Sequence, residues 1–252
     1  MSSSRDRAAL AVVVTLVLFV LARIRRIGPL RPGAESASSP VTVTPPEETE
    51  LPEVARVLGS AFATEAFTAT AFGGPIREVE GEYEQAIELL LHTHVGAGQP
   101  VFVASTDGDV DGVAVVSRPG VSSTPLRLVW QFARHLSIVV RLLQRVDWAG
   151  LHHVARTARP PEGLPSPYYR LEAIGVAPDA QGEGVGRALL DATHDLVEQD
   201  PGASGIYLFT GERSTRTLYE RVGYETVATK RSGDVVAYHM FRPNPTDRRV
   251  NH

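Results

Sequence analysis

The chain has 252 residues, no cysteine and a formal net charge of −4, which allows one domain with a sizeable core and excludes disulfides, thiolate nucleophiles and cysteine-bound metals. The charge is uneven, because residues 1–40 carry six arginines against two carboxylates, a net +4 that leaves −8 on the remainder. An acidic body argues against nucleic-acid binding, which usually needs a basic face, and is compatible with a cationic amine as substrate.

The N-terminal segment is apolar from residue 8 to residue 22, with Thr15 as its one polar residue. Fifteen helical residues span about 22 Å, less than the roughly 30 Å of a bilayer core, but Ile24 and Ile27 extend the run if the arginines between them reach the headgroups. Residues 8–27 are therefore a predicted transmembrane anchor, and the arginines at its C-terminal end favour a cytoplasmic catalytic domain. A translation start assigned too early and a cleaved signal peptide are the alternatives, the second disfavoured because no small-residue cleavage site precedes these arginines.

A linker rich in Pro, Gly, Ser and Ala leads into the predicted domain, which spans residues 41–242 and is followed by a flexible tail at 243–252. Residues 41–44 alternate as a strand, whereas 47–65 and 81–95 have the periodicity of helices. Residues 100–105 and 110–117 are predicted strands, and Asp107-Gly108 between them is a strong hairpin signal.

Residues 121–159 are too long for an ordinary connection between strands. Within them, residues 126–146 and 148–157 are predicted helices, so this segment is interpreted as a helical insertion. It is followed by a proline-rich loop and by a predicted strand at 168–177.

This strand carries one carboxylate, Glu172, on a mostly apolar run. Alternation predicts two faces for the strand: Arg170, Glu172, Ile174 and Val176 on one, and Leu171, Ala173 and Gly175 on the other. A carboxylate in such a place must be paired, solvated or functional. An ion pair with Arg170 is the structural interpretation, and a catalytic base is the functional one.

A glycine-rich loop follows at residues 178–186, and a helix follows the loop. Backbone N–H groups at a helix N-terminus, together with the helix dipole, make such a loop a predicted phosphate site. The loop is not a dinucleotide fingerprint, because Arg187 stands where the third glycine is needed, and it lacks the Gly-Lys-Ser/Thr of a Walker loop. Its sequence is Gln181-x-x-Gly184-x-Gly186.

This loop resembles the acetyl-CoA pyrophosphate loop of the GNAT superfamily of N-acetyltransferases. A predicted strand at 206–210 and a helix at 214–221 follow, and the run Leu218-Tyr219-Glu220-Arg221 with Gly223-Tyr224-Glu225 is similar to the second signature of that family. The two motifs together look closest to the puromycin N-acetyltransferase-like branch. The resemblance covers residues 41–241 and is specific from Tyr168 onward. Two last strands are predicted at 225–230 and 235–241.

The resemblance implies an α+β fold with a central, mostly antiparallel, twisted sheet flanked by helices. It implies acetyl-CoA as co-substrate, entering where the fourth and fifth strands splay apart, an amine acceptor, and no metal. The residues that it implies for cofactor binding are Ile174, Gly175, Val176, Gln181, Gly182, Glu183, Gly184, Val185, Gly186, Arg187 and Thr215. Many family members have Arg or Lys where Glu183 stands and Asn where Thr215 stands.

Two catalytic roles are predicted. An aliphatic amine has a pKa of about 10.4 and attacks only when neutral, so Glu172 is the predicted general base, acting through water. The resemblance implies that Tyr219 is the acid that protonates the leaving thiolate, because the tyrosine on this helix has that place in the family, and packing on the sheet is its alternative role. A backbone N–H near residues 174–176 is predicted to stabilise the oxyanion.

The predicted function is transfer of an acetyl group to a primary amine of a small molecule, by direct attack. The alternatives are a protein lysine or N-terminal acetyltransferase and a non-catalytic acyl-CoA-binding module. In the puromycin-like branch the insertion helps to shape the acceptor pocket; packing without a role in the site, or an interface, are the other interpretations. The pairs His92/His94 and His152/His153 lack zinc-ligand spacing and are predicted to be surface or capping residues.

Overall fold

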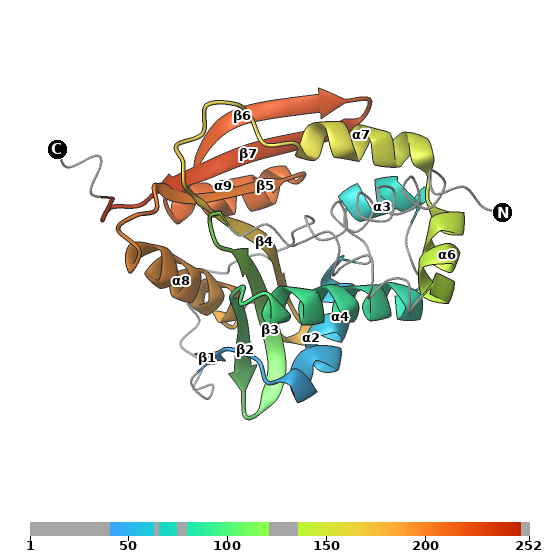
Figure 1. Ribbon diagram of the computed structural model, residues 1–252, viewed down its shortest axis with the longest axis horizontal. Helices are drawn as coiled ribbons and strands as arrows, with labels where there is room; N and C mark the ends of the chain where they lie inside the picture. The colour runs from blue at the N-terminus through green and yellow to red at the C-terminus, as the bar shows by residue number, and fades with distance from the viewer. Residues whose placement is uncertain (1–40, 63–65, 75–79, 121–135, 248–252) are drawn as a thin grey trace.

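The computed structural model describes residues 41–62, 66–74, 80–120 and 136–247. They form one seven-stranded sheet flanked by helices (Figure 1). The strand order is β1-β2-β3-β4-β5-β7-β6, and each neighbouring pair is antiparallel except β4 and β5. The predicted fold class, α+β with a mostly antiparallel sheet, is confirmed.

The elements follow the predicted order. The strands are β1 (Thr42–Thr44), β2 (Val101–Thr106), β3 (Asp109–Ser117), β4 (Tyr169–Val176), β5 (Gly205–Thr210), β6 (Glu225–Ser232) and β7 (Val235–Pro243). The helices are η1 (Glu48–Glu50), α2 (Leu51–Phe62), α3 (Ala66–Phe72), α4 (Glu80–Gly96), α6 (Leu136–Arg145), α7 (Trp148–Ala158), η2 (Pro178–Ala180), α8 (Val185–Glu198) and α9 (Arg213–Arg221). Helix α3 was not predicted, and residues 126–135 of one predicted helix lie outside the described residues.

Two apolar clusters fill the two sides of the sheet. One packs α2, α4 and α7 against it and includes Leu58, Tyr83, Val154, Ala173, Tyr207 and Phe209. The other packs α8 and α9 and includes Leu171, Ile174, Val185, Leu189 and Tyr219. Full burial of a side chain such as leucine stabilises the fold by about 1.5–3 kcal/mol. Gly112 allows the start of α8 to lie on β3, because a Cβ there would be 2.6 Å from Val185 Cγ1.

The hairpin between β2 and β3 confirms the Asp107-Gly108 signal. Both residues have positive φ, +54° and +98°, as the two central residues of a type I′ turn require. These two turn residues connect Thr106 to Asp109, and Thr106 and Asp109 lie opposite each other in the ladder.

A β-bulge interrupts β4 at Glu172. Val115 lies opposite Ala173 and Val116 lies opposite Leu171, so Glu172 is an extra residue in the ladder. As a result Leu171 and Ile174 join the same apolar cluster, on the side of α8 and α9. The predicted grouping of Glu172 with Ile174 and Val176 on one face is therefore wrong, because alternation reverses at the bulge.

Strands β4 and β5 are paired only at their beginnings. Tyr169 lies opposite Ile206 and Arg170 lies opposite Tyr207. After Arg170, β4 pairs with β3 but with no strand on its other side among the residues that the structure describes. The two parallel strands therefore diverge toward the end of β4, where the glycine loop begins.

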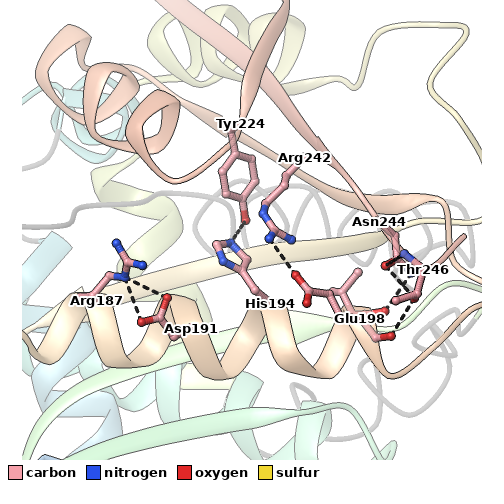
Figure 2. A network of polar contacts seen from close by, with 9 residues as sticks. Arg187, Asp191, His194, Glu198, Tyr224, Arg242, Asn244 and Thr246 are labelled. Carbon is pink, nitrogen blue, oxygen red and sulfur yellow. Dashed lines mark hydrogen bonds and ion pairs between the residues drawn. The ribbon is translucent and has the colours of Figure 1, made fainter.

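The C-terminal part of the described chain packs onto α8. Asn244 is buried, and its side-chain amide donates to the carbonyl oxygens of Val197, Asp200 and Ala203 at 2.9–3.0 Å. Arg242 donates to Glu198 at 2.7 Å in the same region (Figure 2). Packing thus continues past Pro243, into the predicted tail. No helix within the described ranges is long and apolar enough to cross a membrane, and the predicted anchor at residues 8–27 lies outside those ranges.

Candidate active site

The glycine loop forms the N-terminal end of α8. After the single turn of η2, Gly182 and Gly184 adopt left-handed φ values of +95° and +90°. Such a backbone costs an L-residue about 1–2 kcal/mol, which explains the glycines. Gly184 is the N-cap residue of α8. A Cβ built on Gly184 would meet no atom within 4 Å, so this side of the loop is open.

Several backbone donors of the loop face no protein acceptor. Arg187 N and Ala188 N both bond to Gly184 O at 3.0 Å, but in the described chain no acceptor is paired with the N–H groups of Gly182, Gly184, Val185 and Gly186. Orphan N–H groups at the positive end of a helix dipole bind phosphate. The predicted phosphate loop thus has the local geometry that its function needs.

The side chains around this loop point to other partners. Glu183 is exposed. Gln181 Nε2 lies 3.4 Å from Val176 O and connects the loop to the end of β4. Arg187 is directed along α8 and bonds both carboxylate oxygens of Asp191 at 2.9 Å (Figure 2). Of the predicted cofactor residues in the loop, the structure therefore favours backbone groups over side chains.

The end of β4 directs two further N–H groups toward the diverging side. Ala177 N donates to Asp111 O on β3 at 2.7 Å. Because N–H groups alternate in direction along a strand, Gly175 also faces β3, whereas Ile174 and Val176 face away from it, toward β5. These two residues lie beyond the last β4–β5 pair, where a carbonyl oxygen of a ligand can approach their N–H groups.

Glu172 makes the ion pair that the structural interpretation predicted. Arg170 Nε lies 3.5 Å from Glu172 Oε1, and the two side chains are 23% and 16% exposed. The Arg170 guanidinium also lies 5.9 Å from the ring centroid of Tyr207, which belongs to the cluster under α2, α4 and α7. Glu172 therefore lies on that face of the sheet, partly open to solvent, in a bulge that ends β4–β5 pairing.

Tyr219 lies on the opposite face. It is fully buried on α9, in the cluster that contains Ile174 and Val176, and its ring packs edge-on against Tyr224 at 5.3 Å. Thr215, one helical turn earlier, is buried and its Oγ1 lies 3.4 Å from Glu212 Oε2. The two predicted catalytic side chains thus lie on the two faces of the sheet, and the structure does not bring them into contact.

A family model described as "Acetyltransferase (GNAT) domain" matches residues 97–226, more than half of the chain. This chain belongs to the GNAT acetyltransferase family. The family acts by acyl transfer, and the predicted fold and the two motifs agree with this assignment. The match does not distinguish the puromycin N-acetyltransferase-like branch from the rest of the family.

Solved structures share the fold of this GNAT chain. A Corynebacterium glutamicum protein described as "histone acetyltransferase HPA2 and related acetyltransferase" has a TM-score of 0.59 and 21% identity, over 81% of this chain and 96% of that chain. A structure described as an acetyltransferase has a TM-score of 0.53 and 23% identity, over 81% and 99%. YncA, a putative acetyltransferase of Salmonella typhimurium solved with its cofactor acetyl-CoA, has a TM-score of 0.50 and 15% identity, over 81% and 93%. No curated protein matches the chain.

The loop of this GNAT chain fits a pyrophosphate. It offers N–H groups at a helix N-terminus that have no acceptor within the described residues, and a Cβ on Gly184 would meet open space. No group of three or more His, Cys, Asp or Glu within the described ranges could hold a metal ion.

One histidine was misjudged from the sequence. His94 is neither a surface nor a capping residue: it is half-buried, and its Nε2 donates to Val116 O at 2.8 Å. Burial lowers the pKa of His94, against the opposing effects of the Val116 carbonyl, the Glu172 carboxylate and the Pro100 carbonyl. His92 is exposed and lies 3.8 Å from Glu88, whereas His153 Nδ1 lies 2.7 Å from Ser232 Oγ.

Proposed function

We propose that this GNAT chain transfers the acetyl group of acetyl-CoA to a primary amine of a small molecule. The observation that carries the proposal is the divergence of β4 and β5 after Arg170, with the glycine loop at the end of β4. A pyrophosphate on the loop and a thioester beside the N–H groups of Ile174 and Val176 would use donors that have no acceptor in the described part of the chain.

The proposed chemistry is direct attack. The amine nitrogen attacks the thioester carbonyl carbon, a C–N bond forms, and the C–S bond then breaks to release CoA thiolate. Glu172 accepts the proton of the amine through water, and the Tyr219 hydroxyl gives a proton to the thiolate. The backbone N–H groups of Ile174 and Val176 donate to the oxyanion of the tetrahedral intermediate. Tyrosinate then recovers its proton from solvent, and Glu172 releases the one that it gained.

The insertion supports a small acceptor. It is fixed to α4 by Arg141 and Glu82 at 2.9 Å, and to α3 by Asp147 N and Ala71 O at 2.9 Å. It is fixed to β6 by Lys230 Nζ, which donates to Arg159 O at 2.7 Å. Figure 1 shows α7 along the β6–β7 hairpin and α6 beside α4. Leu151 and Val154 of α7 belong to the same cluster as Ala173 and Tyr207, so α7 covers part of the face of the sheet that carries Glu172.

An acceptor face that is partly covered in this way admits a small amine more readily than a folded protein. The same feature supports the likeness to the puromycin N-acetyltransferase-like branch, in which such an insertion helps to shape the acceptor pocket. We also propose that residues 8–27 anchor the chain with its catalytic domain in the cytoplasm, where acetyl-CoA is found. Full-length protein is then expected in the membrane fraction, and recovery in the soluble fraction would contradict the anchor.

The test is release of CoA from acetyl-CoA across a panel of primary amines and lysine peptides. Positioned acids and bases contribute about 10²–10⁴-fold, so Glu172→Gln and Tyr219→Phe should each lower turnover by about 100-fold or more. Glu53→Gln, on the surface, and Tyr238→Phe, which keeps the ring under Arg216, are the matched controls. Wild-type turnover in both catalytic variants would refute the mechanism. Turnover of peptides alone would indicate a protein acetyltransferase, and binding without CoA release a non-catalytic module.

A further inference from the structure

The ladder between β2 and β3 has a missing donor. Val101 lies opposite Val115, so the same register places Pro100 opposite Val116. Val116 N donates to Pro100 O at 3.0 Å. In an antiparallel ladder this pair exchanges two hydrogen bonds, but proline has no N–H. The returning bond, to Val116 O, cannot come from the backbone of Pro100.

His94 supplies that donor. Its Nε2 lies 2.8 Å from Val116 O. A carbonyl oxygen only accepts hydrogen bonds, so Nε2 carries the hydrogen. A buried carbonyl without a donor would lower the free energy of unfolding by about 1–3 kcal/mol. The imidazole of His94, on the neighbouring helix α4, supplies the donor for Val116 O.

The satisfied carbonyl lies at the bulge. Val116 is one of the two β3 residues between which the register with β4 slips, and Glu172 is the extra residue on β4. The residues after α4 secure the same end of β3, because Arg118 N donates to the side-chain oxygen of Gln99 at 2.7 Å. The conformation of β3 at Val116 therefore depends on the end of α4, and the bulge depends on β3.

We propose that His94 is a positioning residue: its Nε2–H replaces the donor that Pro100 lacks, holds the Val116 carbonyl, and so fixes the bulge that carries Glu172. This role rests on the proposed function, in which Glu172 is the base. His94 itself touches no reacting atom. By holding the bulge, it keeps the Glu172 carboxylate in its place beside the diverging strands β4 and β5.

The kinetic test uses three variants of the full chain. His94→Leu removes the donor, His94→Gln keeps a side-chain donor, and His94→Leu combined with Pro100→Ala restores a backbone N–H opposite Val116. A displacement of 1 Å can cost about 100-fold in rate, so His94→Leu should lower kcat by about tenfold or more. Its KM for acetyl-CoA should stay within about twofold, because the phosphate loop is untouched. His94→Gln and the double variant should recover most of the loss. Wild-type kcat in His94→Leu, or no recovery in a folded double variant, would overturn the proposal.

A second measurement needs no catalysis, so it separates this role from the proposed function. Nitrogen-15 NMR of the wild-type protein should show His94 as the neutral Nε2–H tautomer, titrating below its ordinary pKa. The Glu172 carboxylate is the charged group that opposes this shift, beside the carbonyl groups of Val116 and Pro100. Glu172→Gln should therefore lower the His94 titration midpoint further. An Nδ1–H tautomer, or a midpoint that Glu172→Gln leaves unchanged, would contradict the proposed geometry.

Discussion

Replacing Gly184 by alanine separates the strain of the glycine loop from its ligand contact. Gly184 has a φ of +90°, and a Cβ there projects into open space. The substitution therefore adds backbone strain without a clash. A left-handed L-residue costs about 1–2 kcal/mol, which for a domain of this size lowers Tm by roughly 2–4 °C per kcal/mol.

The same methyl group would project from the open side of the loop, on the residue between the N–H groups of Gly184 and Val185. A hydrogen bond to a charged group is worth about 1.5–3 kcal/mol, and 1.4 kcal/mol corresponds to tenfold in Kd. Loss of one such bond to the pyrophosphate predicts that Gly184→Ala weakens acetyl-CoA binding by about 10- to 150-fold.

Gly108→Ala is the matched control. Gly108 has a φ of +98°, its Cβ would also meet no atom within 4 Å, and it lies in the β2–β3 turn. Both variants should lose similar stability in thermal unfolding, but only Gly184→Ala should lose affinity in calorimetric titration with acetyl-CoA. Equal Kd values for the two variants would refute the assignment of the pyrophosphate to this loop.

Three further predictions concern the fold around the site. Gly112→Val should destabilise the protein by about 1–3 kcal/mol in urea unfolding, because its Cβ would lie 2.6 Å from Val185; an unchanged midpoint would contradict the packing of α8 on β3. Burial, and next the charge of Arg242, lower the pKa of His194 to about 4. An unfolded histidine binds its proton near pH 6.5. The contribution of neutral His194 to the free energy of unfolding should therefore be fully present above that pH and decrease by about 3 kcal/mol as the pH drops toward 4. His194→Gln should flatten this profile, and an equally steep profile would exclude His194 as its source. Asn244→Ala should cost about 1–3 kcal/mol, since one carbonyl oxygen at the end of α8 and two in the α8–β5 connection lose their amide donor, and a loss below 0.5 kcal/mol would refute that role.

The glycine loop and its neighbours were predictable because their signals are local. A glycine-rich loop, a helix that starts after Gly184 and an apolar strand before the loop are all encoded within about twenty residues. Helix α3, by contrast, was missed because its sequence AFTATAF has no polar face. That helix packs beside α7, where a Cβ on Gly150 would clash with Thr70 O, and such a contact is visible only in three dimensions.

Neither the bulge at Glu172 nor the hydrogen bond of His94 could be predicted from one segment of the sequence at a time. The bulge is a property of two strands in register, and Glu172 looks like an ordinary member of an alternating run. The role of His94 depends on Pro100 lying opposite Val116, a pairing between residues sixteen positions apart. A proline at the start of a predicted strand was the one sequence signal that a donor would be missing there.

Transfer of an acetyl group to an amine by this GNAT chain would leave two products, CoA and an N-acetyl amine, and both can be measured in one reaction. The full chain would be mixed with acetyl-CoA carrying a carbon-13 acetyl group and with a panel of small primary amines, and the products analysed by mass spectrometry. One labelled N-acetyl amine is expected for each CoA released, with both products suppressed in Tyr219→Phe and Glu172→Gln. Binding of acetyl-CoA with neither product, for any amine of the panel, would contradict acetyl transfer as the function of this chain.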